Sequence, residues 1–359
     1  MELGIGRRAF IASTAVAAAG VGLSACSSGG GGVEGSATSG PINIIGYAGI
    51  WEEQYRAAVI EPFLAEYPDI TVNYASKRSS AEMLSAVQSE GGNRTTDITI
   101  MDIAVSNGGN SQGIFSTLSE EDVPNIANVN PDLVNADGFG PVVMLDAVSL
   151  LYASAEFSTP PESWEVLWDE QYRGKVNVVA PPSGIGINLT AITADMIGED
   201  FTTSIDQTVT KLQELAPNVQ SWAPNPDEYQ SVVTGQTVLG VGQNARAQYY
   251  VDDSDGALGA TVPQEGTVYQ INTINLTADA PNPEAAKTFI NYALSPEAQT
   301  AFAEAMYYAP SIDNAELPEE VAARLVEYGD DGIIPLDQEW LAATRDEWTE
   351  RWNREIVNN

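Results

Sequence analysis

Histidine is absent from this 359-residue chain, and there is a single cysteine, Cys26. The missing histidine removes the usual general base and the commonest transition-metal ligand, and one cysteine excludes a disulfide within the chain. No HExxH helix or Walker loop occurs. The adjacent acids at 120–121 and 330–331 match a glycosidase pair only in residue type, because neighbouring acids in an acid-rich chain usually form solvated surface. We therefore expect no enzyme, no bound metal and no cofactor.

Positive charge is scarce, with 15 basic residues against 50 acidic ones and a net charge of −35. Such a surface will not attract nucleic acid or anionic lipid. Two explanations of the acidity remain open: a surface adapted to salt, or an electrostatic field that attracts a cationic solute. The acids are spread along the whole chain, from Glu52 through Asp169 to Asp346, which favours salt adaptation.

Long apolar runs are also missing, and the longest one lies near the N-terminus. Arg7 and Arg8 precede an apolar run at 10–23 that is too short to span a bilayer, which is typical of an export signal of the twin-arginine type. The run ends in Leu-Ser-Ala-Cys, which resembles a bacterial lipobox. We expect a signal peptide at 1–25 and lipidation of Cys26.

The segment that follows Cys26 is rich in glycine and serine and has no apolar periodicity. We expect a flexible tether at 26–40 that spans roughly 20 Å on average. No later segment approaches 18 consecutive apolar residues. These features predict a soluble body that the lipid anchors to the outer face of the cytoplasmic membrane.

In the body, short β-branched runs alternate with amphipathic stretches, a pattern that predicts an α/β fold. No internal repeat is present. We expect strands at 42–46, 70–74, 97–102, 176–179, 239–241 and 269–276. We expect helices at 51–67, 81–89, 186–197, 283–294, 297–306 and 337–356, the last with Trp340, Trp348 and Trp352 as packing residues.

Seven segments in register resemble one family: WEEQYRAAVIEPFLAEYPDITV at 51–72, NIANVNPDL at 125–133, SWEVLWDEQYRGKV at 163–176, LAPNV at 215–219, GQTVLGVGQN at 235–244, PQEG at 263–266 and APNPEAAKTFINYALSPEAQTAFAE at 280–304. The family is the type 2 periplasmic binding proteins, in the branch that contains spermidine/putrescine-binding proteins. The resemblance covers 42–318, nearly the whole body.

The resemblance implies a two-lobed α/β fold with two hinge crossovers and a solute held in the cleft between the lobes. Lobe 1 would comprise 41–147 plus 273–312, lobe 2 would comprise 148–272, and C-terminal helices at 313–359 would pack across both. The chain would act as a monomer that closes on its solute and then meets the permease subunits of an ABC importer.

The resemblance also suggests site residues at strand ends and helix starts. Trp51 and Glu52 follow the first strand, where Trp51 could equally pack in the core, and Asp102 ends a strand, where it could equally cap a helix. The other candidates are Ser183, Gly184 and Asn188 at a helix start that could be a plain glycine-rich turn, Gln243 and Asn244 after a strand, and Tyr269 and Asn272 at the second crossover.

The chain departs from the polyamine-binding pattern. Where polyamine binders carry acids, the aligned residues are the uncharged Ser183, Gly186 and Asn272, and two aromatic positions become Gln243 and Gln270. A cationic amine needs carboxylates or aromatic faces to replace its hydration. The carboxylates left near the cleft would be Glu52, Asp102 and Asp146. This set predicts a small polar solute, polyamine-like or otherwise amine-bearing.

Two other ligands stay open. Ferric binders in neighbouring families use paired tyrosines soon after a strand, and Tyr249 and Tyr250 follow the strand at 239–241, but four residues separate them from Asn244. The second tyrosine pair, Tyr307 and Tyr308, would more simply pack in the core or hinge. A sugar is the other alternative, although aromatic residues do not cluster in the candidate site segments.

Overall fold

The computed structural model describes residues 36–135, 137–326, 328–329 and 332–358. The expected signal peptide, the lipidation of Cys26 and most of the expected tether lie outside the described residues. The described body forms one compact unit. None of its helices is both long and apolar enough to cross a bilayer.

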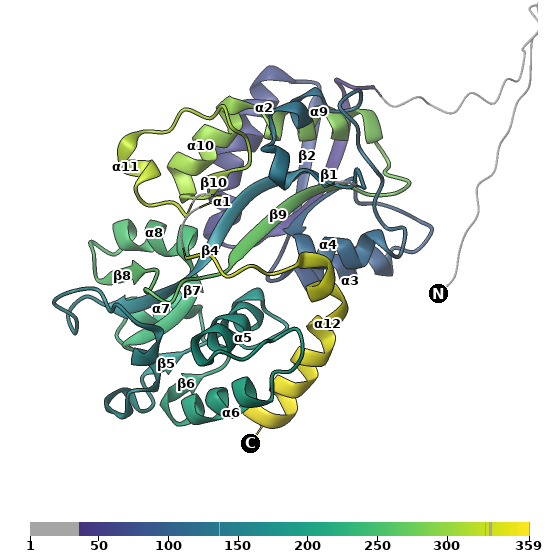
Figure 1. Cartoon of the computed structure of the whole chain (residues 1–359). Helices are drawn as coiled ribbons and strands as arrows, with labels where there is room; N and C mark the ends of the chain where they lie inside the picture. The colour runs from purple at the N-terminus through teal and green to yellow at the C-terminus, as the bar shows by residue number, and fades with distance from the viewer. Residues whose placement is uncertain (1–35, 136, 327, 330–331, 359) are drawn as a thin grey trace, which may run out of the picture. The chain divides into compact units, whose positions relative to one another are not determined.

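The first sheet has the strand order β2-β1-β3-β9-β4 (Figure 1). Strand β1 runs parallel to β2 and β3, and β9 runs antiparallel to β3 and β4, while β10 pairs with β4. The strands are β1 (Gly40–Tyr47), β2 (Ile70–Lys77), β3 (Ile98–Asp102), β4 (Val142–Ala153), β9 (Tyr269–Leu276) and β10 (Ala309–Pro310).

Three of the helices that pack with the first sheet begin within three residues of the end of a strand, at residues 50, 80 and 103. The helix predicted at 51–67 is confirmed, and its central turn is a π-helix. The elements are α1 (Ile50–Tyr55), the π segment Arg56–Ile60, α2 (Glu61–Glu66), α3 (Ser80–Ser89), α4 (Ile103–Asn110), α9 (Pro283–Ala293), α10 (Pro296–Met306) and α11 (Glu319–Ala322), with short 3-10 turns at Pro124–Asn128 and Pro131–Leu133.

The second sheet shares β4 and has the order β6-β5-β7-β4, with β8 also paired to β4. Its strands are β5 (Val176–Asn177), β6 (Val219–Ser221), β7 (Leu239–Gln243) and β8 (Leu258–Thr261). Its helices are α5 (Gly184–Ile197), α6 (Asp206–Leu215), α7 (Glu228–Val233) and α8 (Asn244–Asp253), with 3-10 turns at Trp164–Trp168, Glu170–Tyr172 and Ala216–Asn218.

Strand β4 joins the two sheets. Its first half pairs with β9, and its second half pairs with β7 and β8. Eleven of its twelve residues are buried, so the run lacks the apolar–polar alternation by which a half-exposed strand is recognised. For this reason the sequence did not reveal β4, although it is the longest described strand.

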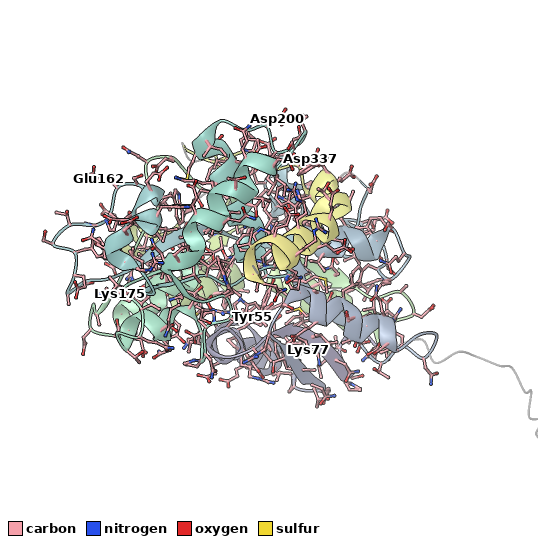
Figure 2. The ribbon with its side chains drawn as sticks, turned by 90° about the horizontal axis from the view of Figure 1, so that it is seen from below. Tyr55, Lys77, Glu162, Lys175, Asp200 and Asp337 are labelled. Carbon is pink, nitrogen blue, oxygen red and sulfur yellow. The ribbon has the colours of Figure 1, made fainter. Side chains whose placement is uncertain are left out.

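Two large hydrophobic clusters fill the body. One surrounds Trp51, Phe63 and Phe289, and the other surrounds Trp164 and Trp352. Two of the acids labelled in Figure 2, Glu162 and Asp200, lie at separate edges of the body.

The C-terminal helix predicted at 337–356 is confirmed as α12 (Gln338–Arg351) and a π segment (Trp352–Val357). Helix α12 contacts α4 and α5, and the π segment contacts α6 (Figure 1). Trp348 and Trp352 are buried, whereas Trp340 is partly exposed. The indole of Trp352 donates a hydrogen bond to Thr190 Oγ1 at 2.8 Å, which ties the chain end to α5.

Trp352→Ala should lower the free energy of unfolding by about 3–5 kcal/mol, because it removes a fully buried indole from this cluster. Trp340→Ala should cost less, because that ring is already partly exposed. Urea unfolding followed by circular dichroism measures both changes. Equal effects of the two substitutions would contradict the assigned packing.

Candidate binding site

The paired strands β4 and β9 have two faces with different chemistry. Asp146 lies opposite Gln270, and Leu145 lies opposite Ile271. Because side chains alternate along a strand, Asp146, Gln270 and Asn272 share one side of the pair, whereas Tyr269 and Ile271 point to the other. We call these the front face and the back face.

Tyr47, at the end of β1, connects the first sheet to the front face. Its hydroxyl donates to Asn272 Oδ1 at 2.8 Å and lies 2.8 Å from Ser80 Oγ. Ser80 Oγ in turn accepts a hydrogen bond from the backbone N–H of Asp102 at 3.0 Å. Burial, and then the nearby charge of Asp102, raise the pKa of Tyr47, so its hydroxyl keeps its proton.

Asp102 joins the front face to α12. Its carboxylate caps α4 by accepting from the N–H groups of Ala104 and Val105, and it lies 3.7 Å from Arg345 Nη1. Arg345 also donates to the carbonyl oxygen of Pro182 at 2.7 Å, directly before α5. Burial raises the pKa of Asp102, and the charge of Arg345 opposes that rise. The arginine thereby links α4, which packs on the first sheet, to the start of α5.

The start of α8 forms the remaining side of the front face. Gln243 pairs with Val148, which shares a face of β4 with Asp146. Asp146 Oδ1 accepts from the N–H groups of Ala245 and Ala147, at 2.8 and 2.7 Å. Burial raises the pKa of Asp146 to about 7, against these hydrogen bonds and the charge of Arg246, which lower it.

Five buried polar atoms of these residues have no hydrogen-bond partner among the described residues. They comprise three acceptors and two donors: Asp146 Oδ2, Gln243 Oε1, Gln270 Oε1, Asn272 Nδ2 and Arg246 Nε. An unsatisfied buried polar group typically costs about 1–3 kcal/mol. Five such atoms close together lower the stability of the fold. They form a suitable lining for a polar ligand, because the ligand's own polar groups would supply the missing hydrogen bonds. We call this group the front-face site.

The front-face site includes two predicted residues, Gln243 and Asn272, and a third, Asp102, pairs with Asn272 on the same face. Ser183 and Gly184 follow Pro182, which Arg345 links to Asp102, and Ser183 Oγ caps α5 by accepting from the N–H of Ile185. The neighbourhood of Trp51 is connected as well, because its ring lies 5.5 Å from that of Tyr47.

Other predicted residues have different surroundings. The indole of Trp51 is fully buried and stacks on Tyr55 at 4.6 Å, and Glu52 pairs with Arg56 at 2.9 Å. Packing therefore accounts for the ring of Trp51, whose indole N–H has no hydrogen-bond partner among the described residues, and an ion pair accounts for the carboxylate of Glu52.

Asn244 is also engaged, since it donates to the carbonyl of Arg324 and accepts from Gln248 Nε2. Asn188 is buried within α5.

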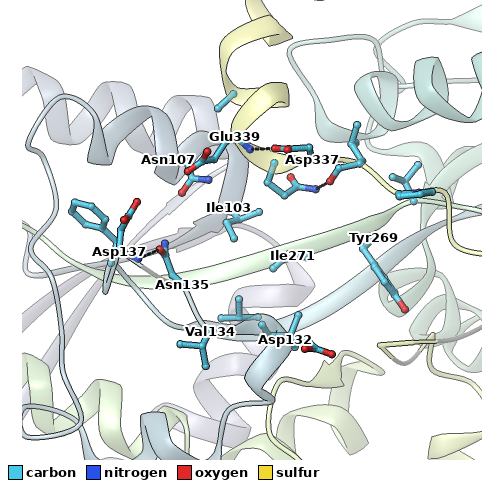
Figure 3. Close-up of a pocket in the computed structure, with 18 of the residues that line it drawn as sticks. Ile103, Asn107, Asp132, Val134, Asn135, Asp137, Tyr269, Ile271, Asp337 and Glu339 are labelled. Carbon is cyan, nitrogen blue, oxygen red and sulfur yellow. Dashed lines mark hydrogen bonds between the residues drawn. The ribbon is translucent and has the colours of Figure 1, made fainter. Parts of the chain in front are cut away.

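Tyr269 lies on the back face, where it lines a cavity of about 1110 Å³ (Figure 3). Its ring stacks on Tyr328 at 5.6 Å, and its hydroxyl accepts from the N–H of Gly329. Ile271 lines the same cavity beside the start of α12, where Asp337 caps the helix. The structure therefore separates Tyr269 from Asn272, although both lie on β9.

Sequence reasoning did not select Tyr47, Ser80 or Arg246. Tyr47 is the last residue of β1, one position beyond the strand predicted at 42–46, and Ser80 lies one residue past a helix cap, so neither stands out from the local sequence pattern. Arg246 did offer a signal, because it is one of few cations and follows a strand end closely.

Comparison with known proteins shows which family this chain is similar to. Residues 58–326 match a family model described as bacterial extracellular solute-binding protein. The chain is 25% identical over 292 residues to spermidine/putrescine-binding periplasmic protein 1 of Haemophilus influenzae, covering 77% of this chain and 78% of that one. It is 25% identical over 211 residues to the gamma-aminobutyric acid-binding protein of Pseudomonas aeruginosa, covering 56% and 58%.

Among solved structures, an ABC transporter protein from Clostridium perfringens superposes with a TM-score of 0.69. The two chains are 25% identical, and the match covers 88% of this chain and 99% of that one. The expected two-lobed α/β architecture is confirmed by this likeness.

Tyr47→Phe should destabilise the protein by about 1–3 kcal/mol, because Asn272 Oδ1 and Ser80 would lose their partner in a buried site. Tyr55→Phe is the matched control, since the Tyr55 hydroxyl is buried without a partner among the described residues, and it should not destabilise the protein, because the desolvation cost of that hydroxyl is removed with it. Chemical denaturation of both variants measures their free energies of unfolding. A Tyr47→Phe variant as stable as the control would remove the argument for this network.

Proposed function

Since the chain belongs to the bacterial extracellular solute-binding protein family and is the substrate-binding component of an ABC importer, we propose that its front-face site captures a small polar solute bearing an amine. The family consists of transporter components and not of enzymes. The proposal depends mainly on one observation: three buried acceptor oxygens without partners among the described residues lie close together, two on the crossing strands β4 and β9 and one at the end of β7, which pairs with β4.

An ammonium group carries three N–H donors and no acceptor. Asp146 Oδ2, Gln243 Oε1 and Gln270 Oε1 offer three acceptors, one of them on a carboxylate. A cation leaving water needs such replacement for its hydration. The names of the relatives from Haemophilus influenzae and Pseudomonas aeruginosa fit this reading, because spermidine, putrescine and gamma-aminobutyric acid all carry amines.

Capture would proceed by closure of two lobes, comprising 41–147 plus 273–312 and 148–272, with 313–359 packed across both. Arg345 supports this mechanism, because it spans from Asp102 to Pro182 and its bonds would break if the halves separated. A solute that contacts both halves stabilises the closed state by its differential affinity. The permease would then recognise the closed monomer.

The place of action follows from the N-terminal expectations. We propose that a signal peptide at 1–25 directs export and that a lipid on Cys26 holds the body by a tether at 26–40. The protein would act at the outer face of the cytoplasmic membrane.

Iron has weaker support than an amine. Tyr250, one of the paired tyrosines, stacks on Tyr229 at 5.2 Å, and burial raises the pKa of Tyr250 to about 12, which disfavours tyrosinate. No group of three or more Asp, Glu or Cys residues is arranged for a metal within the described part of the chain.

A thermal-shift screen of the body tests the proposal, with putrescine, spermidine, gamma-aminobutyric acid, maltose and ferric citrate. We expect stabilisation by at least one amine and none by maltose. Stabilisation by ferric citrate alone, with a visible tyrosinate band, would replace the amine with iron.

Amine affinity should rise with pH because of Asp146. Its pKa of about 7 in the solute-free protein means that it is mostly protonated at pH 5.5, and an ammonium favours the ionised form. Binding should therefore be roughly 30-fold tighter at pH 8 than at pH 5.5, as measured by calorimetry.

Asp146→Asn should bind the amine more weakly at pH 8 and lose this pH dependence. The titratable groups that reach Asp146 electrostatically are Arg246, Tyr229 and Tyr308, and all three keep their protons throughout this range. An unchanged pH slope in the variant would assign the titration to another residue.

A further inference from the structure

Arg246 is unlike the other described arginines. It lies in the first turn of α8, and its Nε is buried without a hydrogen-bond partner in the part of the chain that the structure describes. Most of the others form ion pairs with carboxylates: Arg56, Arg94, Arg324, Arg345, Arg351 and Arg354. The two that do not, Arg78 and Arg173, are exposed.

No carboxylate of the described residues lies within 4.0 Å of the Arg246 guanidinium. The ring of Tyr229 lies beside it, with its centroid 5.9 Å from the guanidinium carbon. Such a contact compensates only part of the hydration that a cation loses on burial.

The groups around Arg246 leave its charge incompletely balanced. The carboxyls of Asp146 and Glu228 reach it electrostatically, and burial raises the pKa of both. The hydroxyls of Tyr229, Tyr250 and Tyr308 also face it, and burial raises their pKa values, so they remain neutral. An arginine stays charged at any physiological pH.

The unsatisfied polar atoms of the front-face site include both donors and acceptors. Arg246 Nε and Asn272 Nδ2 are donors that need an acceptor, whereas Asp146, Gln243 and Gln270 present acceptors that need a donor. Asn272 is wholly buried, and its Oδ1 is already occupied by Tyr47, which directs its Nδ2 elsewhere. One small molecule with both an anionic and a cationic end would satisfy both kinds.

We propose that Arg246 binds the carboxylate of the solute, so that the site takes a short amino acid in its zwitterionic form and not a di- or polyamine. The planar guanidinium matches a carboxylate with two parallel hydrogen bonds. The carboxylate lies at Arg246 and the ammonium at Asp146, whose Oδ1 accepts from the N–H of Ala245, next to Arg246 in the chain. The two charged ends are therefore held close together.

Charge also opposes a diamine at this site. Its second ammonium would lie near the unpaired guanidinium of Arg246, and like charges at close range in a buried site repel strongly. The inference rests on the proposed function of the front-face site and specifies its substrate class.

Isothermal titration calorimetry with matched ligands tests the inference: 4-aminobutyrate, 3-aminopropanoate, 4-aminobutanamide and putrescine. On the unmodified protein we expect at least one of the two acids to bind at least 30-fold more tightly than the amide and putrescine. This comparison uses only the unmodified protein, so it tests the inference even if a substitution impairs folding.

Arg246→Gln should weaken binding of the acid at least 30-fold and change binding of the amide less than 3-fold, with Arg246→Lys intermediate. Arg173→Gln is the matched control, because Arg173 is exposed and unpaired, and it should bind like the unmodified protein.

Tighter binding of putrescine than of both acids, or an Arg246→Gln variant that binds the acid normally, would overturn the inference and leave the proposed amine function standing. Failure of all four probes would reject the zwitterion as substrate class, and an absence of binding by every amine in the thermal-shift screen would reject the proposed function itself.

Discussion

Alternation of side chains along the paired strands β4 and β9 determines where polar chemistry can gather in this protein. Asp146, Gln270 and Asn272 share a face because they are two residues apart or directly opposite in register. The helix starts after β3 and β7 meet that face, and Tyr47 ties it to β1 by a hydrogen bond. Because β4 belongs to both sheets, anything bound there lies at the junction of the two halves. The proposed binding site and the proposed hinge are thus the same piece of backbone.

The fold could largely be predicted from the sequence, for physical reasons that differ between elements. The helix from 51 to 67 shows apolar spacing at Tyr55, Val59 and Phe63, and these side chains do fill the core. The strand at 269–276 and the helices at 283–294 and 297–306 carry clear boundaries in proline, serine and glycine. The family match confirms the resemblance that these segments carry together. Strand β4 was not predicted, because full burial removes the apolar–polar alternation by which a half-exposed strand is recognised.

The site was harder to predict, because the sequence gives the position of a residue along the chain but not the direction in which its side chain points. Tyr269 and Asn272 were equally plausible on one strand, yet a difference of three residues sends them to opposite faces. Trp51 follows a strand as a ligand residue would, but only packing shows that its indole fills the core. Arg246 was overlooked beside Asn244, and its lack of a carboxylate partner is visible only when the whole chain is folded.

A crystal structure of the protein grown with the tightest-binding amine from a screen tests the central claim most directly. The account predicts that the ligand lies on the front face, with its ammonium within hydrogen-bond distance of Asp146 Oδ2 and enclosed between the starts of α4 and α8. Ligand density in the back-face cavity beside Tyr269, or a ligand whose ammonium points away from Asp146, would contradict it.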